Sequence, residues 1–195
     1  DTNKEGQISI SSVESQLRRI KSEGRKCFAI VATAGTTVRG AIDPLIELGA
    51  LCKSEDLWLH VDGAIGGIFA LSNKTAPLLN GISVANSVTL NPQKLLGITK
   101  TSSLLLVANR SNLISTFATG LPYIEPAWGE DAHGGEMGLQ GTRPAEVLKL
   151  WLGLRQLGVN GIERLIEESI NRRRYFEKHL DLSKLNIISG PLHLI

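Results

Sequence analysis

The sequence predicts an α/β protein with a mostly parallel sheet flanked by helices, and three observations support this fold class. Short apolar segments alternate with amphipathic ones, as in βαβ units. Glycine is frequent, at 20 of 195 residues, while aromatic residues make up only 5%, which suits many tight strand–helix turns. Cys27–Ala32 is wholly apolar, which is typical of a strand buried on both faces of a sheet.

The first predicted element is a helix that begins at Ser11. Ser11 and Glu14 form a capping-box pattern, in which each side chain bonds a free backbone amide of the first turn. Apolar residues then recur at helical spacing: Val13, Leu17 and Ile20. Gly24 is the expected end of this helix.

The βαβ pattern occupies the next part of the chain. The strand Cys27–Ala32 is followed by a helix that Pro44 opens and that runs to about Lys53. Three more apolar runs predict strands: Leu57–Asp62, Ser87–Leu90 and Leu104–Val107.

The pattern changes in the last third of the chain. Residues 120–141 are rich in glycine, proline and isolated aromatics, which predicts a long loop of the kind that is usually functional or disordered. A helix is expected from Pro144 to about Leu157, with Gly158 breaking it before a second helix over residues 162–180. Asn186–Ile188 is expected to begin another strand.

Composition and charge exclude several classes of protein and partner. Lys and Arg number 21 against 19 Asp and Glu, so no strong field favours nucleic acid or an anionic membrane. No apolar run approaches the roughly 20 residues of a membrane span, and the polar first residues carry no signal-peptide core. Cys27 and Cys52 are expected to be free thiols in a reducing compartment rather than a disulfide or metal site, which predicts a cytoplasmic protein.

Polar residues follow three of the predicted strands, where ligands bind in open α/β sheets. These segments are Thr33–Thr37, Asp62–Gly67 and Asn91–Lys94. Taken singly, Asp62 could cap a helix and Lys94 could be an ordinary exposed lysine. Together, a lysine after a turn and an aspartate at another strand end are what a pyridoxal phosphate (PLP) enzyme needs: an amine for the cofactor aldehyde and a carboxylate for its pyridine nitrogen.

These segments resemble the group II PLP-dependent amino acid decarboxylases, which include the aromatic amino acid, glutamate and cysteine sulfinate decarboxylases. His60–Gly67 is similar to the family pattern HVDAAxGG, and Asn86–Lys94 to DSxxxNPHK. Ala32–Thr37 also matches, at matching intervals, and the resemblance continues through Gly141–Arg143 and the helix that contains residues 148–152. It implies part of a PLP-dependent transferase fold of type I, with an aspartate aminotransferase-like large domain.

The resemblance also implies a domain organisation. Residues 1–143 would be the C-terminal portion of the PLP-binding large domain, residues 144–180 the helices linking to the small domain, and residues 181–195 the start of that domain. The family's phosphate-binding turn and the histidine that stacks on the cofactor match nothing in this sequence. We therefore expect the chain to be part of a larger protein.

Roles for individual residues follow from the resemblance alone. It implies that Lys94 forms the Schiff base, that Asp62 pairs with the pyridine nitrogen and that Ala64 packs on the ring face. Thr37 and Asn91 would lie in the cofactor pocket, with Asn91 towards the phosphate.

Three further positions are expected near the site. Tyr123 falls where the family has a loop tyrosine that assists protonation of the α-carbon, or is an ordinary loop aromatic. Arg143 would neutralise a phosphate or carboxylate across a dimer interface, or form a structural ion pair. Gln93 stands at a cofactor-pocket position where most members have His, and it cannot titrate near neutral pH.

The function implied by the resemblance is decarboxylation of an L-amino acid, through a Schiff base on Lys94 and a quinonoid intermediate, in a homodimer. The sequence does not identify the amino acid. Two alternatives stay open: another PLP carbon–carbon lyase, similar to the sphingosine-phosphate-lyase branch, or a truncated, non-catalytic dimerisation partner of a complete enzyme.

Overall fold

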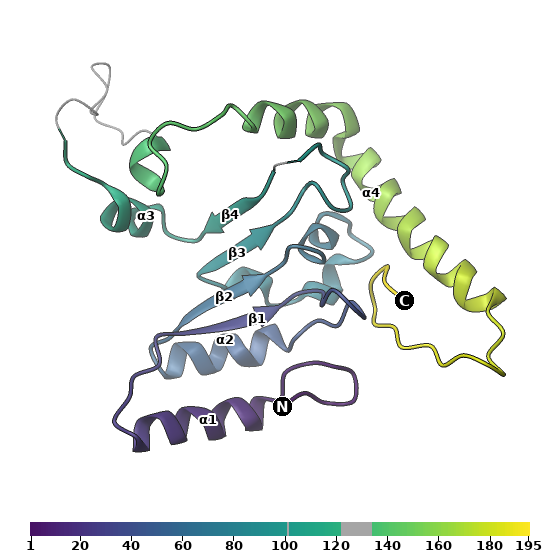
Figure 1. Cartoon of the computed structure of the whole chain (residues 1–195), viewed down its shortest axis with the longest axis horizontal. Helices are drawn as coiled ribbons and strands as arrows, with labels where there is room; N and C mark the ends of the chain where they lie inside the picture. The colour runs from purple at the N-terminus through teal and green to yellow at the C-terminus, as the bar shows by residue number, and fades with distance from the viewer. Residues whose placement is uncertain (101, 122–133) are drawn as a thin grey trace.

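A four-stranded sheet forms the centre of the computed structural model, which describes residues 1–100, 102–121 and 134–195 (Figure 1). Its strands lie in the order β1 (Ala29–Thr33), β2 (Trp58–Asp62), β3 (Ser87–Leu90) and β4 (Leu104–Val107). The first three are parallel and β4 is antiparallel to β3. This confirms the predicted α/β class and its mostly parallel sheet.

The two faces of the sheet differ in chemistry. One face is apolar and packs against α2 (Leu45–Ser54) with four buried side chains: Ile30, Ala32, Leu59 and Val61. On the other face Val31 is 59% exposed, so the prediction that Cys27–Ala32 is buried on both faces is wrong. The described residues leave Val31 open to solvent, while Ala29 and Thr33 on the same face are half-buried. The strand therefore shows the ordinary alternation of period 2.

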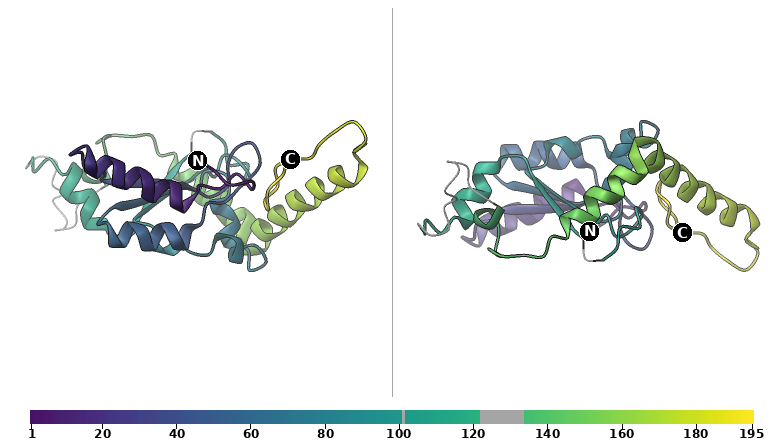
Figure 2. Two further views of the ribbon diagram at one scale, coloured as in Figure 1. Left: turned by 90° about the horizontal axis from the view of Figure 1, so that it is seen from below. Right: turned by 90° about the horizontal axis from the view of Figure 1, so that it is seen from above.

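The N-terminal helix α1 (Ile10–Ser22) begins earlier than expected. Its cap is Ser9, whose hydroxyl accepts a hydrogen bond from the Ser12 amide at 3.4 Å. The capping box assigned to Ser11 is therefore wrong, because Ser11 lies within the first turn and its hydroxyl bonds that of Ser9. Figure 2 shows α1 and α2 on opposite sides of the sheet. The expected end at Gly24 is confirmed by its left-handed φ of 69°.

Short helices fill the connections. Three 3-10 helices lie between β2 and β3: η1 (Gly67–Leu71), η2 (Ala76–Leu79) and η3 (Ile82–Val84). The α-helix α3 (Arg110–Phe117) was not predicted, although the Asn109 side chain caps it by accepting from the Ser111 amide at 3.0 Å. A fourth 3-10 helix, η4 (Gly134–Met137), interrupts the predicted loop 120–141.

The long helix α4 (Val147–His179) is bent at Gly158, where φ is 59° and ψ is 179°. The break predicted at this glycine is confirmed. Before the bend α4 buries Leu150, and after it Ile162 and Ile166. Within the described residues, every helix is too short or too polar to cross a lipid bilayer.

The C-terminal segment after α4 returns to the end of β1 (Figure 1). Asn186–Ile188 pairs with no strand among the described residues, so the strand predicted there is wrong. Instead Leu192 is fully buried against three glycines: Gly35, Gly40 and Gly66. His193 stacks on Phe69 of η1 with ring centroids 5.5 Å apart. This segment therefore packs behind the loops that follow β1 and β2.

Replacing Leu192 by Ala is expected to lower the free energy of unfolding by about 2–5 kcal/mol, because it leaves a cavity between packed loops. Urea denaturation of the full-length protein measures the change. Leu185→Ala is the matched control, since Leu185 is 51% exposed, and it is expected to change stability by less than about 0.5 kcal/mol. Equal losses in the two variants would show that Leu192 is not an anchor.

The protein is expected to lose stability as the pH falls below about 6.5. Burial, and secondarily the nearby Arg173 cation, lower the pKa of His193. The unfolded chain therefore binds more protons than the folded one in this range. The stabilisation that comes from His193 is complete above the pKa of this group in the unfolded chain. It is lost as the pH falls towards its lowered pKa in the folded protein. Urea midpoints between about pH 5 and pH 8 should fall less steeply in His193→Gln, whereas His179→Gln on the exposed end of α4 should keep the parent slope. An unchanged slope in His193→Gln would contradict this assignment.

Candidate active site

The carboxyl ends of β1, β2 and β3 are joined through their backbones. The Ala34 amide donates to the Asp62 carbonyl at 2.8 Å, and the Gly66 amide donates back to the Ala34 carbonyl at 3.0 Å. Gly63 lies close to β3, since a Cβ there would be 3.0 Å from the Thr89 carbonyl oxygen. The three segments singled out in the sequence therefore meet at one edge of the sheet.

Glycine is required where these loops touch. A Cβ on Gly66 would lie 2.2 Å from the Ala34 carbonyl oxygen, a separation that real side chains do not reach. Gly35 adopts a left-handed φ of 99°, which glycine adopts without strain. The local sequence thus allows two strand-end loops to approach without side chains between them.

Asp62 is the last residue of β2 and shares a sheet face with His60, two residues earlier. Its Oδ1 accepts a hydrogen bond from the Ala64 amide at 3.0 Å. Its Oδ2 receives no hydrogen bond from the residues that the structure describes. Asp62 and Ala64 are both half-buried. The Ala64 amide thus holds Oδ1 in place, and Oδ2 is available to a cation.

Lys94 lies in a turn directly after β3. Its backbone amide donates to the Asn91 carbonyl at 3.0 Å, while its side chain is exposed and forms no ion pair with any described residue. Asn91 Oδ1 accepts from the Ser103 hydroxyl at 2.7 Å, and Gln93 Oε1 accepts from the Ser102 amide at 3.1 Å. The two amide side chains therefore tie the lysine turn to the segment that leads into β4.

Helix α4 supports this turn from behind. Ile98 is buried and lies so close to α4 that a Cβ on Gly153 would be 2.1 Å from its Cδ1 atom. Lys149 Nζ donates to the Lys100 carbonyl at 2.9 Å. The first half of α4 thus holds the chain that carries Lys94.

Of the remaining expected site residues, those that the structure describes form no hydrogen bond with Asp62 or Lys94. Thr37 is exposed, and it is Thr36 that stabilises the loop, by accepting from the Ala41 amide at 3.0 Å. Arg143 is exposed and donates to carbonyls of its own loop, at Gly134 and Gln140. Tyr123 lies outside the described residues.

Sequence reasoning missed a ladder of polar side chains next to Asp62. Trp58 Nε1 donates to Ser87 Oγ at 2.8 Å, and His60 Nδ1 bonds the same oxygen at 2.8 Å. His60 Nε2 bonds Thr89 Oγ1 at 3.2 Å. The signal was the alternation of β2, which puts its polar residues on the face that also carries Asp62.

Asp43 was also missed. This buried carboxylate accepts from the Ile8 amide and from the Thr33 amide, each at 2.7 Å. It therefore fixes the N-terminal loop to the end of β1, next to the first of the three joined loops.

Comparison with known proteins agrees with this geometry. Residues 1–189 match the family described as "Pyridoxal-dependent decarboxylase conserved domain". The chain belongs to the pyridoxal-dependent decarboxylase family. It is 34% identical to an aromatic-L-amino-acid decarboxylase from Bacillus atrophaeus over 94% of this chain and 39% of that protein. It is 35% identical to the mouse acidic amino acid decarboxylase GADL1 over 90% of this chain and 32% of that protein.

Solved structures agree with the family and the fold. Mouse CSAD in its apo form matches with a TM-score of 0.83 and 34% identity, over 91% of this chain and 37% of that one. Rice TDC with PLP and tryptamine, at 21% identity, shares the fold with a TM-score of 0.89 over 97% of this chain and 40% of that one. The chain thus spans about two fifths or less of the length of these proteins.

The chemistry of the described side chains fits PLP, the cofactor of the family. Asp62 offers a carboxylate oxygen that no described residue occupies, as a protonated ring nitrogen requires. Lys94 offers an amine that is exposed and outside any described ion pair. Asn91 keeps its amide nitrogen as a donor, because its oxygen accepts from Ser103.

Proposed function

We propose that the protein containing this chain decarboxylates an L-amino acid with the help of PLP. The proposal is carried by the placement of Asp62 at the end of β2 and of Lys94 in the turn after the adjacent parallel strand β3, in a chain whose residues 1–189 match the family. The expectation from sequence rested on the same two residues.

Each group around the site would hold one part of the cofactor. Lys94 would bind it through the ε-amine, and Asp62 would pair with its ring nitrogen. Ala64 would pack its methyl group on the ring face, and the Asn91 amide would lie towards the phosphate. When bound, PLP supplies an electron-accepting ring for the electron pair left by the departing CO2.

The chain's own residues would orient and stabilise the reacting groups. The Asp62 carboxylate, held by the Ala64 amide, would stabilise positive charge on the ring nitrogen. Tyr123 would donate the proton that replaces the carboxyl group on the α-carbon. Thr37 and Gln93 would line the pocket, and Gln93 would act as an amide that does not titrate, in the place of the family's usual histidine.

We propose no single amino acid as substrate. The relatives are named as decarboxylases of aromatic and of acidic amino acids, and changes of one or two pocket residues can alter the substrate class of an enzyme. Release of CO2 from glutamate, aspartate, cysteine sulfinate, diaminobutyrate and aromatic amino acids, measured on the full-length protein, identifies the class. Release of an aldehyde instead of CO2 would favour a carbon–carbon lyase and contradict the proposal.

We further propose a cytoplasmic homodimer. The free cysteines and the modest charge are consistent with a reducing compartment. Apolar side chains at the start of α4 remain exposed in the single chain, including Leu148, Trp151 and Leu152, and a subunit interface would cover them. The boundaries proposed for the domains are residues 1–143 for the large-domain portion, 144–180 for the linking helices and 181–195 for the start of the small domain.

Lys94→Ala is expected to abolish the visible absorbance band of the bound cofactor and to lower decarboxylation by at least about a thousandfold, because the anchoring amine is lost. A spectrum of the purified protein and a CO2-release assay measure the two effects. Lys53→Ala, at the exposed end of α2, is the matched control and should leave both unchanged. A band that survives in Lys94→Ala would exclude Lys94 as the anchor.

Asp62→Asn is expected to weaken cofactor binding about thirtyfold or more, because removing one charge of a close, buried charge pair costs about 2–5 kcal/mol. Equilibrium dialysis against PLP measures the dissociation constant. Asp181→Asn, in an exposed turn after α4, is the control. Unaltered PLP affinity in Asp62→Asn would remove Asp62 from the proposed site.

A further inference from the structure

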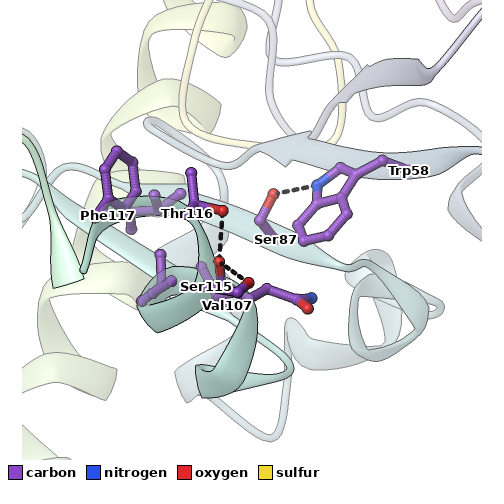
Figure 3. A pocket seen from close by; sticks show the side chains of 9 residues that line it. Trp58, Ser87, Val107, Ser115, Thr116 and Phe117 are labelled. Atoms are coloured by element: carbon purple, nitrogen blue, oxygen red, sulfur yellow. Dashed lines mark hydrogen bonds between the residues drawn. The ribbon is translucent and has the colours of Figure 1, made fainter. Parts of the chain in front are cut away.

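The polar ladder of Trp58, His60, Ser87 and Thr89 has one consistent direction of hydrogen bonding. The indole nitrogen of Trp58 can only donate, so Ser87 Oγ accepts its hydrogen bond at 2.8 Å. Figure 3 shows this contact at a pocket of about 330 Å³ that residues of α3, among them Thr116 and Phe117, also line. Ser87 therefore still has one hydroxyl proton to place.

His60 provides the acceptor for that proton. Ser87 is only 6% exposed, and among the described residues His60 Nδ1, at 2.8 Å, is the one remaining partner of its hydroxyl. A proton on Nδ1 would leave the Ser87 hydroxyl without an acceptor among the described residues, which is unfavourable for a buried group. Nδ1 is therefore the unprotonated nitrogen, and the proton of the neutral ring lies on Nε2.

The hydrogen bond between His60 and Thr89 continues the same donor-to-acceptor order to the end of β3. His60 Nε2 donates to Thr89 Oγ1 at 3.2 Å, so the Thr89 hydroxyl accepts from the ring and keeps its own proton. Thr89 is the register partner of Asp62 on the neighbouring parallel strand, and partners in register share a face. The ladder thus ends in a hydroxyl donor on the face and at the strand end that carry Asp62.

We propose that His60 is a positioning residue of the candidate site, acting through a one-way chain of hydrogen bonds from Trp58 through Ser87 and His60 to Thr89. This chain holds the Thr89 hydroxyl as a donor beside the Asp62 carboxylate and the cationic group that Asp62 would bind. The inference rests on the proposed function for its second part only, because the direction of the chain follows from the contacts themselves.

The direction is tested by long-range proton–nitrogen NMR on the full-length protein labelled with ¹⁵N-histidine. His60→Gln assigns the His60 signals by their loss. We expect the neutral ring with its proton on Nε2 in the parent and a mixture of both tautomers in Ser87→Ala, which removes the donor to Nδ1. A parent ring protonated on Nδ1 would overturn the proposal, and this result needs no bound PLP.

The effect on the site is tested by PLP affinity and by the position of the visible absorbance band. His60→Leu removes both ring nitrogens and is expected to weaken PLP binding about tenfold. His60→Gln places an amide donor near the position of Nε2 and is expected to recover most of that loss. His179→Gln, on the exposed end of α4, is the control and should match the parent.

The outcomes separate the two proposals. Parent affinity and an unshifted band in both His60 variants would show that His60 has no positioning role. If His60→Leu does not fold, the affinity of His60→Gln relative to Ser87→Ala decides. The glutamine keeps a donor to Thr89 in every molecule, whereas the ring of Ser87→Ala donates from Nε2 in only part of them. A parent protein that binds no PLP would contradict the proposed function, while the tautomer would still decide the direction of the chain.

Discussion

The hydrogen bond between the Gly66 amide and the Ala34 carbonyl is the contact on which the candidate site depends. It joins the loop after β1 to the loop after β2, and it forms because residue 66 has no side chain. Asp62 lies four residues before this contact, at the end of β2, and Leu192 closes the opposite side of the same loops. The position of the Asp62 carboxylate in the candidate site thus depends on backbone packing as well as on its hydrogen bond from the Ala64 amide.

The two faces of the sheet carry different kinds of side chain. Its apolar face packs on α2 and contributes the core, while the opposite face carries hydrogen-bonding side chains from β2 and β3. The turn that bears Lys94 is held by amide side chains at one end and by α4 behind it. A rigid scaffold of this kind keeps Asp62, at the end of β2, and Lys94, in the turn after β3, at fixed places.

Much of this arrangement could be predicted from local patterns, and the errors have physical causes. The ends of β2 and β3 were predicted because their apolar runs stop at polar residues, Asp62 and Asn91. The cap of α1 was misassigned because Ser9, Ser11 and Ser12 are all able to cap, and only the backbone angles at Ser9 decide. Helix α3 was missed because eight residues carry little periodicity. The ladder through His60 depends on the register between strands, which a single sequence does not contain.

The bend at Gly158 gives α4 two independent directions. Its first half packs against the segment that carries Lys94. Its second half leads to the C-terminal segment, which packs behind the loops that follow β1 and β2. A φ of 59° with a ψ of 179° is a conformation that side chains with a Cβ strongly disfavour, so this position tolerates almost no substitution. Gly158 is therefore a hinge point between the half of α4 that supports Lys94 and the half that leads to the C-terminal segment. A change of its backbone angles would move the C-terminal segment without moving Lys94.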